Sequence, residues 1–336
     1  MPAEKKRRSG FSVQWVPSFL ILVAMVLITA FLQDNLLTQR GLINIVNSYF
    51  PLVLMTIGQT AVLISGCIDL SSGAALSLIS CVLASTMQAG DPVSGWVAIG
   101  LAAAMALATA LMNGFIVGIR RVPPVIATYA TSFIYLGAAL FILPRPGGEC
   151  TNWVTGFYRF SSVDGAPQWL QTLGGYLPPI AIVTLLMLLI WSFMRRTRFG
   201  RYLYATGSNE TSAYFSGIPT ARVRMGAYLF NALCILLTAI FFVAQNQTAD
   251  YQFGDAYTLK SIAAAVIGGV AMTGGRGSAV GALIGALILS FVNKIIFFSG
   301  LPNAYQTLVN GVIVIASLLV SYLYTFANRR IKERKG

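Results

Sequence analysis

The feature that most constrains this chain is a series of apolar runs, each about as long as a helix that crosses a membrane. A helix needs roughly 18 or more consecutive apolar residues to span the hydrocarbon core of a bilayer. In lipid, only helices and closed barrels satisfy every backbone polar group. We therefore predict an all-α fold, a polytopic transmembrane helical bundle of about ten spans. The runs stand at residues 16–33, 42–65, 72–89, 95–118, 124–143, 178–194, 223–245, 259–273, 278–297 and 303–326.

The composition agrees with a membrane protein. Hydrophobic residues make up 56% of the 336 residues and charged residues only 10%, whereas a soluble domain carries about 25% charged residues. The net charge of +13 does not indicate nucleic-acid binding, because no basic helix interleaved with stacking aromatics is present. The sequence divides into a basic segment at 1–15, a transmembrane domain at 16–326 and a basic tail at 327–336.

The basic residues gather on one side of the bundle if the chain crosses the membrane ten times. The two ends, the pair Arg120 and Arg121, and the arginine-rich loop 195–222 then share that side. Cytoplasmic loops carry an excess of Lys and Arg. We therefore expect both termini and this loop in the cytoplasm, with the first span retained rather than cleaved as a signal peptide.

Two breaks interrupt the apolar runs. The stretch GCIDLSS separates the second run from the third, and the eighth run, LKSIAAAVIGGVAM, is short and continues into TGGRGS. Irregular backbone cannot face lipid, so we predict discontinuous helices that are buried in the bundle. The similarity of 62–79 to 265–284 predicts an internal repeat, from which many transporters are built. The candidate break and pathway residues are Gly66, Asp69, Ser71, Gly73, Gly268, Gly269, Gly274, Gly275 and Gly277.

Asp69 has two interpretations. An acid at membrane depth is by default a candidate for a functional pathway. Asp69 also stands with Ser71 and Ser72 where the third run begins, and an N-cap there stabilises a helix by about 0.5–2 kcal/mol. We favour capping over contact with a substrate. Hydrogen bonding between helices is likewise favoured over pathway lining for Asn113, Asn231, Asn293, Asn310 and Gln306.

The chain carries no machinery of its own for energy or catalysis. It contains no G-x-x-x-x-G-K-[ST] phosphate loop and no histidine, and Asp69 is the only acid clearly inside a run, so proton coupling is poorly supported. The four cysteines lack CxxC spacing, so no metal site is expected. We expect no cofactor and no enzymatic activity, so that any uphill transport draws its energy from another subunit.

The polar loop 195–222 contains a short helix with signals at both ends. Ser208 or Asn209 can accept the free N–H groups at its start, and Glu210 lies in the first turn, where the helix dipole favours an acid. Gly217 can take the left-handed conformation that ends a helix, and Pro219 prevents continuation.

This short helix displays two aromatic side chains, Tyr214 and Phe215. A helix that presents aromatics from a basic loop is suited to dock in the groove of a partner. It is equally suited to be a surface helix that only connects two spans. Local physics alone leaves both alternatives open.

The same loop closely resembles the cytoplasmic coupling loop of ribose-type sugar permeases of ATP-binding-cassette importers. The stretch TRFGRYLYATGSNETSAYFSGI follows the family pattern T-x-F-G-x-x-x-Y-A-x-G-x-N-x-x-x-A-x-x-x-G-I. Two further stretches, ISGCIDLSSGA and SIAAAVIGGVAMTGGRGSAVGALIGAL, resemble other segments of the family, in the same order over residues 40–325. The matching loop residues are Thr197, Phe199, Gly200, Tyr204, Ala205, Gly207, Asn209, Ala213, Gly217 and Ile218.

The resemblance implies an all-helical permease of the bacterial inner membrane that works with a second permease, either a copy or a paralogue. It implies cytoplasmic ATPase subunits as the energy source and an extracytoplasmic binding protein, which we expect the long outer loop 144–177 to help dock. Cys67 and Ser72 depart from the family's usual Gly and Val. The resemblance also implies that the helix seats in the ATPase through Asn209, Glu210, Ala213, Tyr214, Phe215, Gly217 and Ile218, with Thr197, Phe199 and Gly200 at the root of the loop.

The function expected from these observations is import of a monosaccharide or a similar small polar solute. The alternative is a stand-alone secondary transporter or channel for such a solute. An intramembrane enzyme is disfavoured, because the sequence offers no combination of a nucleophile with a base and no metal-ligand cluster.

Overall fold

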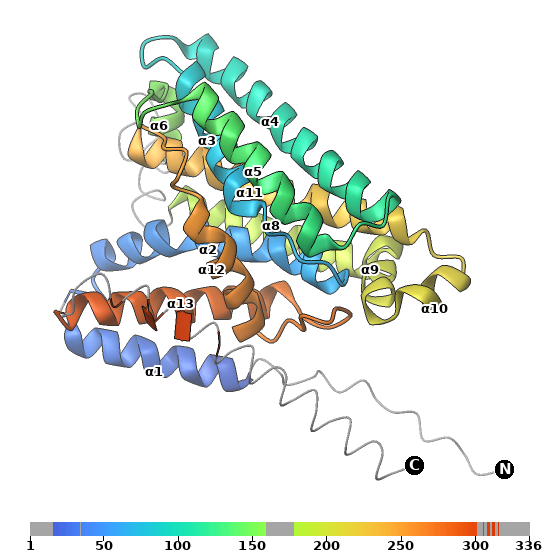
Figure 1. Ribbon diagram of the computed structural model, residues 1–336. Coiled ribbons are helices and arrows are strands. Elements are labelled where there is room, and N and C mark those ends of the chain that lie inside the picture. The colour runs from blue at the N-terminus through green and yellow to red at the C-terminus, as the bar shows by residue number, and fades with distance from the viewer. Residues whose placement is uncertain are drawn as a thin grey trace.

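The computed structural model describes residues 16–33, 35–158 and 178–300, together with positions 305, 308, 309, 311, 312 and 315. Within these ranges the chain forms helices, and its only bridges of β type are two isolated ones (Figure 1). The helices are α1 (Val16–Leu32), α2 (Gln39–Ile64), α3 (Ser72–Thr86), α4 (Pro92–Gly114), the π-helix η2 (Phe115–Ile119), α5 (Pro124–Ile142), α6 (Asn152–Tyr158), α8 (Pro179–Arg196), α9 (Arg198–Ser208), α10 (Glu210–Phe215), α11 (Thr220–Asn246), α12 (Asp255–Ile267) and α13 (Ala279–Phe298).

Six of the described helices are long and apolar enough to cross a membrane, namely α2, α4 with its extension η2, α5, α8, α11 and α13. The helices α1 and α3 are apolar but shorter. The prediction of an all-α, multi-pass bundle is therefore confirmed. The count of about ten spans stays a prediction, because nearly all of 303–326 lies outside the described residues, as do the basic ends at 1–15 and 327–336.

The predicted span at 259–273 is wrong at both ends. The helix α12 begins at Asp255 and ends after 13 residues at Ile267. It stops there because Gly269 has a positive φ of 86°, a conformation that closes a helix and that glycine adopts without strain. The helices α12 and α13 are thus separated by an irregular segment, as α2 and α3 are, in agreement with the predicted discontinuous helices.

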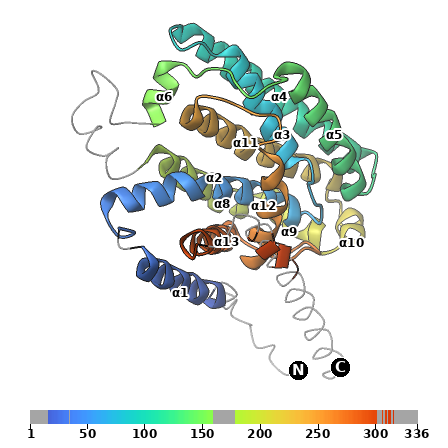
Figure 2. The ribbon, with the colours of Figure 1, turned by 60° about the vertical axis from the view of Figure 1, so that its left-hand side comes forward.

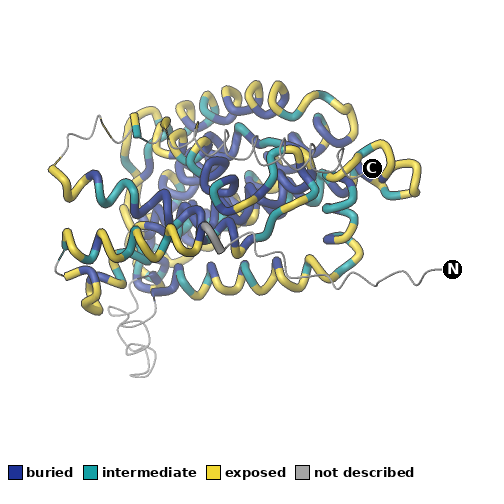
Figure 3. The backbone as a smooth tube through the Cα atoms, turned by 90° about the horizontal axis from the view of Figure 1, so that it is seen from below, coloured by how far each residue is buried: buried dark blue, intermediate teal, exposed yellow. Residues whose placement is uncertain are grey.

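The helices α2 and α11 form the centre of the bundle. In the most apolar 18-residue stretch of α2, 61% of the residues are buried, and in that of α11, 72% are buried. The corresponding value is 33% for each of α4, α5 and α8. Figure 3 shows the buried part of the chain inside and exposed positions along the outer helices. Leu101, Phe133 and Leu185 on those outer helices remain exposed. Such apolar outer faces fit contact with lipid.

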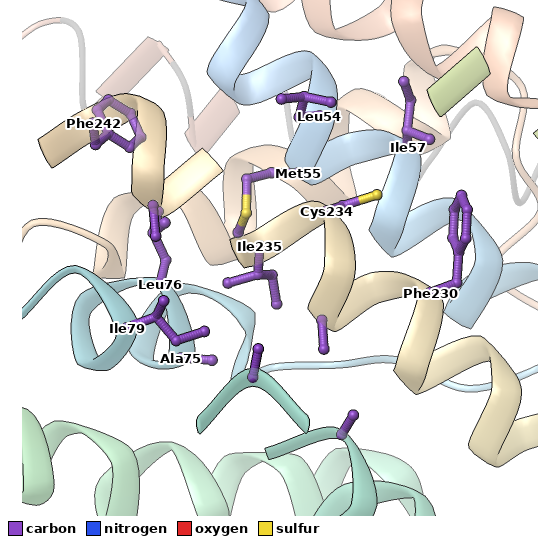
Figure 4. Packing of buried hydrophobic residues seen from close by; sticks show 14 of the residues in the cluster. Leu54, Met55, Ile57, Ala75, Leu76, Ile79, Phe230, Cys234, Ile235 and Phe242 are labelled. Atoms are coloured by element: carbon purple, nitrogen blue, oxygen red, sulfur yellow. The ribbon is translucent and has the colours of Figure 1, made fainter. Parts of the chain in front are cut away.

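The core joins α2 and α11 to α3. Met55 of α2 points toward Ile235 of α11, which lies beside Leu76 and Ile79 of α3 (Figure 4). The two central helices approach closely, because a Cβ atom placed on Gly58 would lie 2.9 Å from the Cβ atom of Cys234. The four cysteines are free and buried and act as small hydrophobes. This close approach brings the polar face of α11 against the break that follows α2.

Candidate functional site

The break between α2 and α3, residues 65–71, is held by side chains from distant helices. Leu70 donates its backbone N–H to Thr128 Oγ1 of α5 at 3.0 Å, and Gly73 donates to Thr258 Oγ1 of α12 at 3.0 Å. Gly73 also packs against the backbone carbonyl of Gly254, so that a Cβ atom has no room there. These contacts satisfy the donors of irregular backbone within the bundle, as burial requires.

Asp69 does not cap α3 in the predicted way. The N-cap is Ser71, and its side chain makes no capping bond. Asp69 Oδ1 accepts instead from the backbone N–H of Ser71 at 2.8 Å and from its hydroxyl at 2.6 Å. Its second oxygen, Oδ2, accepts from Asn231 Nδ2 of α11 at 2.8 Å. The carboxylate therefore ties the break to α11, because one oxygen is used for the local turn and the other for a distant helix.

A network of buried hydrogen bonds extends from Asp69 into neighbouring helices. Asn113 of α4 donates to Ser71 Oγ at 2.8 Å and accepts from Thr131 of α5 at 2.8 Å. Asn231 also donates to Ser72 Oγ at 3.1 Å. Ser72 in turn donates to Gln59 Oε1 of α2 at 3.0 Å. The predicted role of Asn113 and Asn231 in bonding between helices is confirmed.

Within the described residues, the predicted hydrogen bonding between helices is not found for the other three polar residues of the apolar runs, Asn293, Gln306 and Asn310. No hydrogen-bond partner of Asn293 Oδ1 is present in the described part of the chain, so its predicted role is not supported there. Gln306 and Asn310 lie outside the described residues. The sequence did not single out Gln59 or Thr131, because a lone amide or hydroxyl in an apolar run carries no signal for its partner.

A cavity of about 10 Å³ lies against this network and is lined in part by Asp69, Asn113, Tyr228 and Asn231. A cavity of this volume holds at most about one water molecule. A sugar therefore cannot occupy the centre of the network in this conformation. The geometry favours a structural role of Asp69 over direct contact with a substrate.

The second break, residues 268–278, is rich in glycines with positive φ. The φ angles are 86° at Gly269, 85° at Gly274, 71° at Gly275 and 137° at Gly277. The remaining predicted break residue, Gly268, packs against the carbonyl of Gly281, so that a Cβ atom has no room there. The predicted break residues therefore carry the backbone conformations and close contacts that only glycine allows.

The two breaks begin with the same backbone motif. After α2, Gly66 has φ 81°, its N–H donates to Leu63 O, and Cys67 N–H donates to Val62 O at 3.1 Å. After α12, Gly269 donates to Val266 O, and Val270 donates to Ala265 O at 3.0 Å. This pattern is the Schellman motif, in which a left-handed glycine closes a helix.

The short helix of the loop, α10, has the predicted caps. Asn209 Oδ1 accepts from the backbone N–H of Ser212 at 2.9 Å, so Asn209, and not Ser208, is the N-cap. Gly217 has φ 80°, and Ile218 donates to Ala213 O at 3.1 Å, which closes the helix in a third Schellman motif. Glu210 Oε2 pairs with Arg224 of α11 at 2.6 Å.

The root of the loop is also built locally. Thr197 caps α9, because its hydroxyl oxygen accepts from Gly200 N–H at 3.4 Å. Gly200 packs against the carbonyl of Met194, and the ring of Phe199 fills the space beside Gly226 of α11. The helix α9 is therefore fixed against both α8 and α11.

The aromatic side chains of α10 point away from the bundle. Phe215 is 82% exposed and Tyr214 is 55% exposed, and Arg121 lies over the Tyr214 ring at 5.5 Å from its centroid. Figures 1 and 2 show α10 at the edge of the molecule, beside α9. These residues are free to contact a partner within the part of the chain that the structure describes.

The end of α9 touches both breaks. Gly207 packs so closely on the carbonyl of Ile64 that no Cβ atom fits between them. Gly275 donates its N–H to the same carbonyl at 2.9 Å. The Tyr204 hydroxyl donates to Gly277 O at 2.7 Å, and burial raises the pKa of this hydroxyl, so it stays protonated as a donor.

We call this meeting point of α9 with the two breaks the glycine junction, and define it by Ile64, Gly66, Gly207, Gly274 and Gly275. The three stretches that the sequence marked separately meet here. Gly207 was noted only as a matched position of the loop pattern, since packing against a remote carbonyl leaves no local signal. The helix α9, which precedes α10 in the chain, therefore contacts both breaks at this junction.

Metal-ligating side chains do not gather around this site in the described part of the chain. Across residues 16–33, 35–158 and 178–300, no three Cys, Asp or Glu side chains gather as a metal site would require. The arrangement is one of helix breaks, hydrogen bonds and close packing.

Comparison with known proteins gives one family and several relatives. The profile of the family described as the permease component of the branched-chain amino acid transport system matches residues 41–318. Ribose import permease protein RbsC of Escherichia coli (strain K12) is 33% identical over 317 residues, which cover 93% of this chain and 96% of that protein. No solved structure matches the chain.

Two further relatives extend the comparison. Ribose import permease protein RbsC of Bacillus subtilis (strain 168) is 32% identical over 311 residues, which cover 92% of each chain. Autoinducer 2 import system permease protein LsrC of Yersinia pestis (strain Pestoides F) is 26% identical over 324 residues, which cover 95% of this chain and 88% of that protein. The family match includes both breaks and the loop 195–222.

Proposed function

The chain belongs to the family described as the permease component of the branched-chain amino acid transport system, and we propose that it is the transmembrane permease subunit of an ATP-binding-cassette importer. The observation that carries the proposal is the glycine junction, where α9 packs on both helix breaks. Next to it, α10 exposes Tyr214 and Phe215. A partner that binds α10 would act on both breaks through α9, because α9 contacts both of them at this junction.

The solute in this proposal is a monosaccharide or a similar small polar molecule. The support comes from relatives, two of which are named for ribose import and are aligned over most of both chains. The family description names branched-chain amino acids instead. We favour the sugar because these two relatives match at 33% and 32% identity nearly end to end.

The proposal includes partners. Cytoplasmic ATPase subunits supply the energy, an extracytoplasmic binding protein supplies the solute, and a second permease, either a copy or a paralogue, completes the passage. The helix α10 with its caps Asn209 and Gly217 is the segment that seats in the ATPase. The outer loop 144–177 is proposed to help dock the binding protein. Its described part contains the short helix α6.

The proposed placement is the bacterial inner membrane, with about ten spans and with both termini and the loop 195–222 in the cytoplasm. The Arg pair at 120 and 121 and the arginines of the loop support this orientation through the positive-inside rule. The shared Schellman motifs after α2 and α12 support the proposed internal repeat, because they occur at equivalent positions of 62–79 and 265–284.

The experiment that tests the function is recovery of the ATPase encoded beside this chain when the permease is purified from membranes. Phe215→Ala should reduce that recovery strongly, because a buried aromatic often supplies a large share of the binding energy of a small interface. The matched control is Phe141→Ala, since Phe141 is 88% exposed on α5, a helix outside the loop. ATP-dependent sugar uptake into vesicles should fall with Phe215→Ala only.

The outcome that rules out the proposal is a permease that takes up solute without ATPase. If Phe215→Ala, Tyr214→Ala and the parent chain recover the same ATPase and transport equally, the loop is only a connector. Uptake that persists without any ATPase would favour the stand-alone transporter or channel.

A further inference from the structure

A second, larger pocket lies away from the glycine junction. It has a volume of about 310 Å³ and opens between the first part of α2 and the end of α11. Pockets that hold small ligands measure roughly 300–1,000 Å³, so this pocket is large enough for one small solute. Its lining residues are Asn44, Asn47 and Ser48 from α2, and Phe241, Phe242, Gln245 and Asn246 from α11.

The polar wall of this pocket consists of carboxamides and one hydroxyl. Each carboxamide offers two N–H donors and one carbonyl acceptor. In the described part of the chain, the side chains of Asn44, Asn47, Gln245 and Asn246 make no hydrogen bond with one another or with any other residue. Asn47 is half-buried, and the other three are exposed. The hydrogen-bonding capacity of four amides is therefore free to meet a ligand.

The apolar floor is formed by two buried phenyl rings. Phe241 packs edge-on against Tyr158, with ring centroids 5.2 Å apart. Phe242 packs against Phe253 at 4.4 Å and against Tyr257 at 5.3 Å. These contacts tie the floor to α6 and α12, so the rings keep their positions when the pocket is occupied.

The lining selects a class of ligand by charge. Among the described residues, the lining contains no Lys, Arg, Asp or Glu. A free amino acid carries an ammonium and a carboxylate, which are costly to take out of water without charged partners. A neutral polyol needs donors and acceptors for its hydroxyl groups and a carbon surface for its C–H face. Amides above phenyl rings meet both needs.

We propose that this pocket is a transit site for a neutral monosaccharide at the outer end of the permease. The proposal rests on the proposed function, because it takes the outer side from the orientation given there. In that orientation both the start of α2 and the end of α11 lie outside. A transit site must bind weakly enough to release the solute onward, and uncharged amides provide hydrogen bonds without a strong charge-assisted one.

The experiment is protection of a cysteine reporter from labelling. The four native cysteines are buried, so they contribute little background with a membrane-impermeant maleimide. The reporter is Ser48→Cys, which replaces an exposed lining hydroxyl by a thiol of similar shape. The control reporter is Ser85→Cys, since Ser85 is also an exposed serine at a helix end on the proposed outer side but does not line the pocket. Intact membranes that contain the permease with its ATPase are labelled from outside.

The expected result is that millimolar D-ribose, D-glucose or D-galactose slows labelling of Ser48→Cys several-fold, whereas L-leucine and D-gluconate do not. The Ser85→Cys reporter should be unaffected by all five. Adding Asn47→Ala to the Ser48→Cys chain should abolish protection, while Gln88→Ala, which removes an exposed amide outside the lining, should preserve it.

Three outcomes overturn the proposal: no labelling of Ser48→Cys from outside, no protection by any of the sugars, or equal protection by L-leucine. Protection without recovery of an ATPase would instead reject the importer function while keeping the sugar site. Recovery of the ATPase without protection would reject the site alone.

Discussion

Asn231 of α11 donates a hydrogen bond of 2.8 Å to the carboxylate of Asp69, although 162 residues separate them in the chain. Both residues are buried. The bond joins the first helix break to α11, one of the two central helices of the bundle. It also accounts for an acid at membrane depth without assigning it to the solute.

The first prediction concerns this pair. Asp69→Leu should yield little folded protein, because the N–H and hydroxyl of Ser71 and the amide of Asn231 all lose their acceptor, at about 1–3 kcal/mol for each buried group. Asp69→Asn should retain substantial transport, because Asn231 Oδ1 has no partner among the described residues and can accept from the new amide after the Asn231 side chain flips. Size-exclusion chromatography and uptake measurements distinguish the two. A well-folded but inactive Asp69→Leu protein would favour a pathway role for the acid.

The second prediction concerns the glycine junction. Gly207→Ala should lose transport, because the added methyl group collides with the carbonyl of Ile64 and pushes α9 away from both breaks. Gly137→Ala is the matched control, since this exposed helical glycine of α5 has open space around it. Replacing glycine by alanine in a helix gains up to about 1 kcal/mol. Equal uptake by both variants would show that α9 need not touch the breaks.

The third prediction concerns the end of α10. Gly217 has φ 80° and free space around it, so a substitution there is penalised by backbone strain rather than by collision. Gly217→Val should cost at least about 1–2 kcal/mol and change the direction in which the chain leaves α10. Gly217→Asn should be milder, because asparagine tolerates this conformation. We expect Gly217→Val to assemble in membranes but to hydrolyse ATP without response to the binding protein. A normal response would mean that the angle of α10 is unimportant.

The fourth prediction concerns the pair formed by Glu210 and Arg224. The Glu210 side chain is 40% exposed and that of Arg224 is 12% exposed. Partly exposed pairs contribute about 0–1 kcal/mol, so Glu210→Gln should change stability little. The double variant Glu210→Arg with Arg224→Glu should recover part of any uptake that Glu210→Arg loses, as measured in a double-mutant cycle. If the double variant is as impaired as the sum of the single variants, the pair does not link α10 to α11.

The fifth prediction concerns orientation. A reporter enzyme that is active only in the cytoplasm should be active when it is fused at Arg121 or at Ser208. A reporter enzyme that is active only outside the cytoplasm should be active when it is fused at Gly156. The reason is the accumulation of arginines around the first two positions. A fusion at Ser208 that reports the outer side would overturn the proposed coupling role of α10 together with the count of spans.

The sequence by itself determined the features that depend on neighbours within one or two turns. The apolar runs predicted the membrane helices, since a span of lipid thickness is a property of consecutive residues. The caps of α10, Asn209 and Gly217, were predictable because each bonds within four residues. The glycine breaks after Ile64 and Ile267 were located for the same reason. The helix end predicted near residue 273 was wrong, because Gly269 already closes α12 and the apolar residues after it do not extend the helix.

Only the tertiary structure decided which distant groups meet. Asp69 was predicted to be a local cap, but one of its oxygens accepts a hydrogen bond from Asn231. At the start of α3, the backbone N–H of Gly73 donates to Thr258 Oγ1 of α12. Gly207 and Ile64 meet because α9 folds back onto both breaks, and the amides of α2 and α11 line one pocket because those helices pack together. Small residues allow two helices to approach closely in a membrane, but they do not specify which helix is the partner. The hydrophobic effect does not specify it either, because lipid is as apolar as the helix surfaces. The partners are therefore chosen by the packing of the whole bundle, which no local pattern encodes.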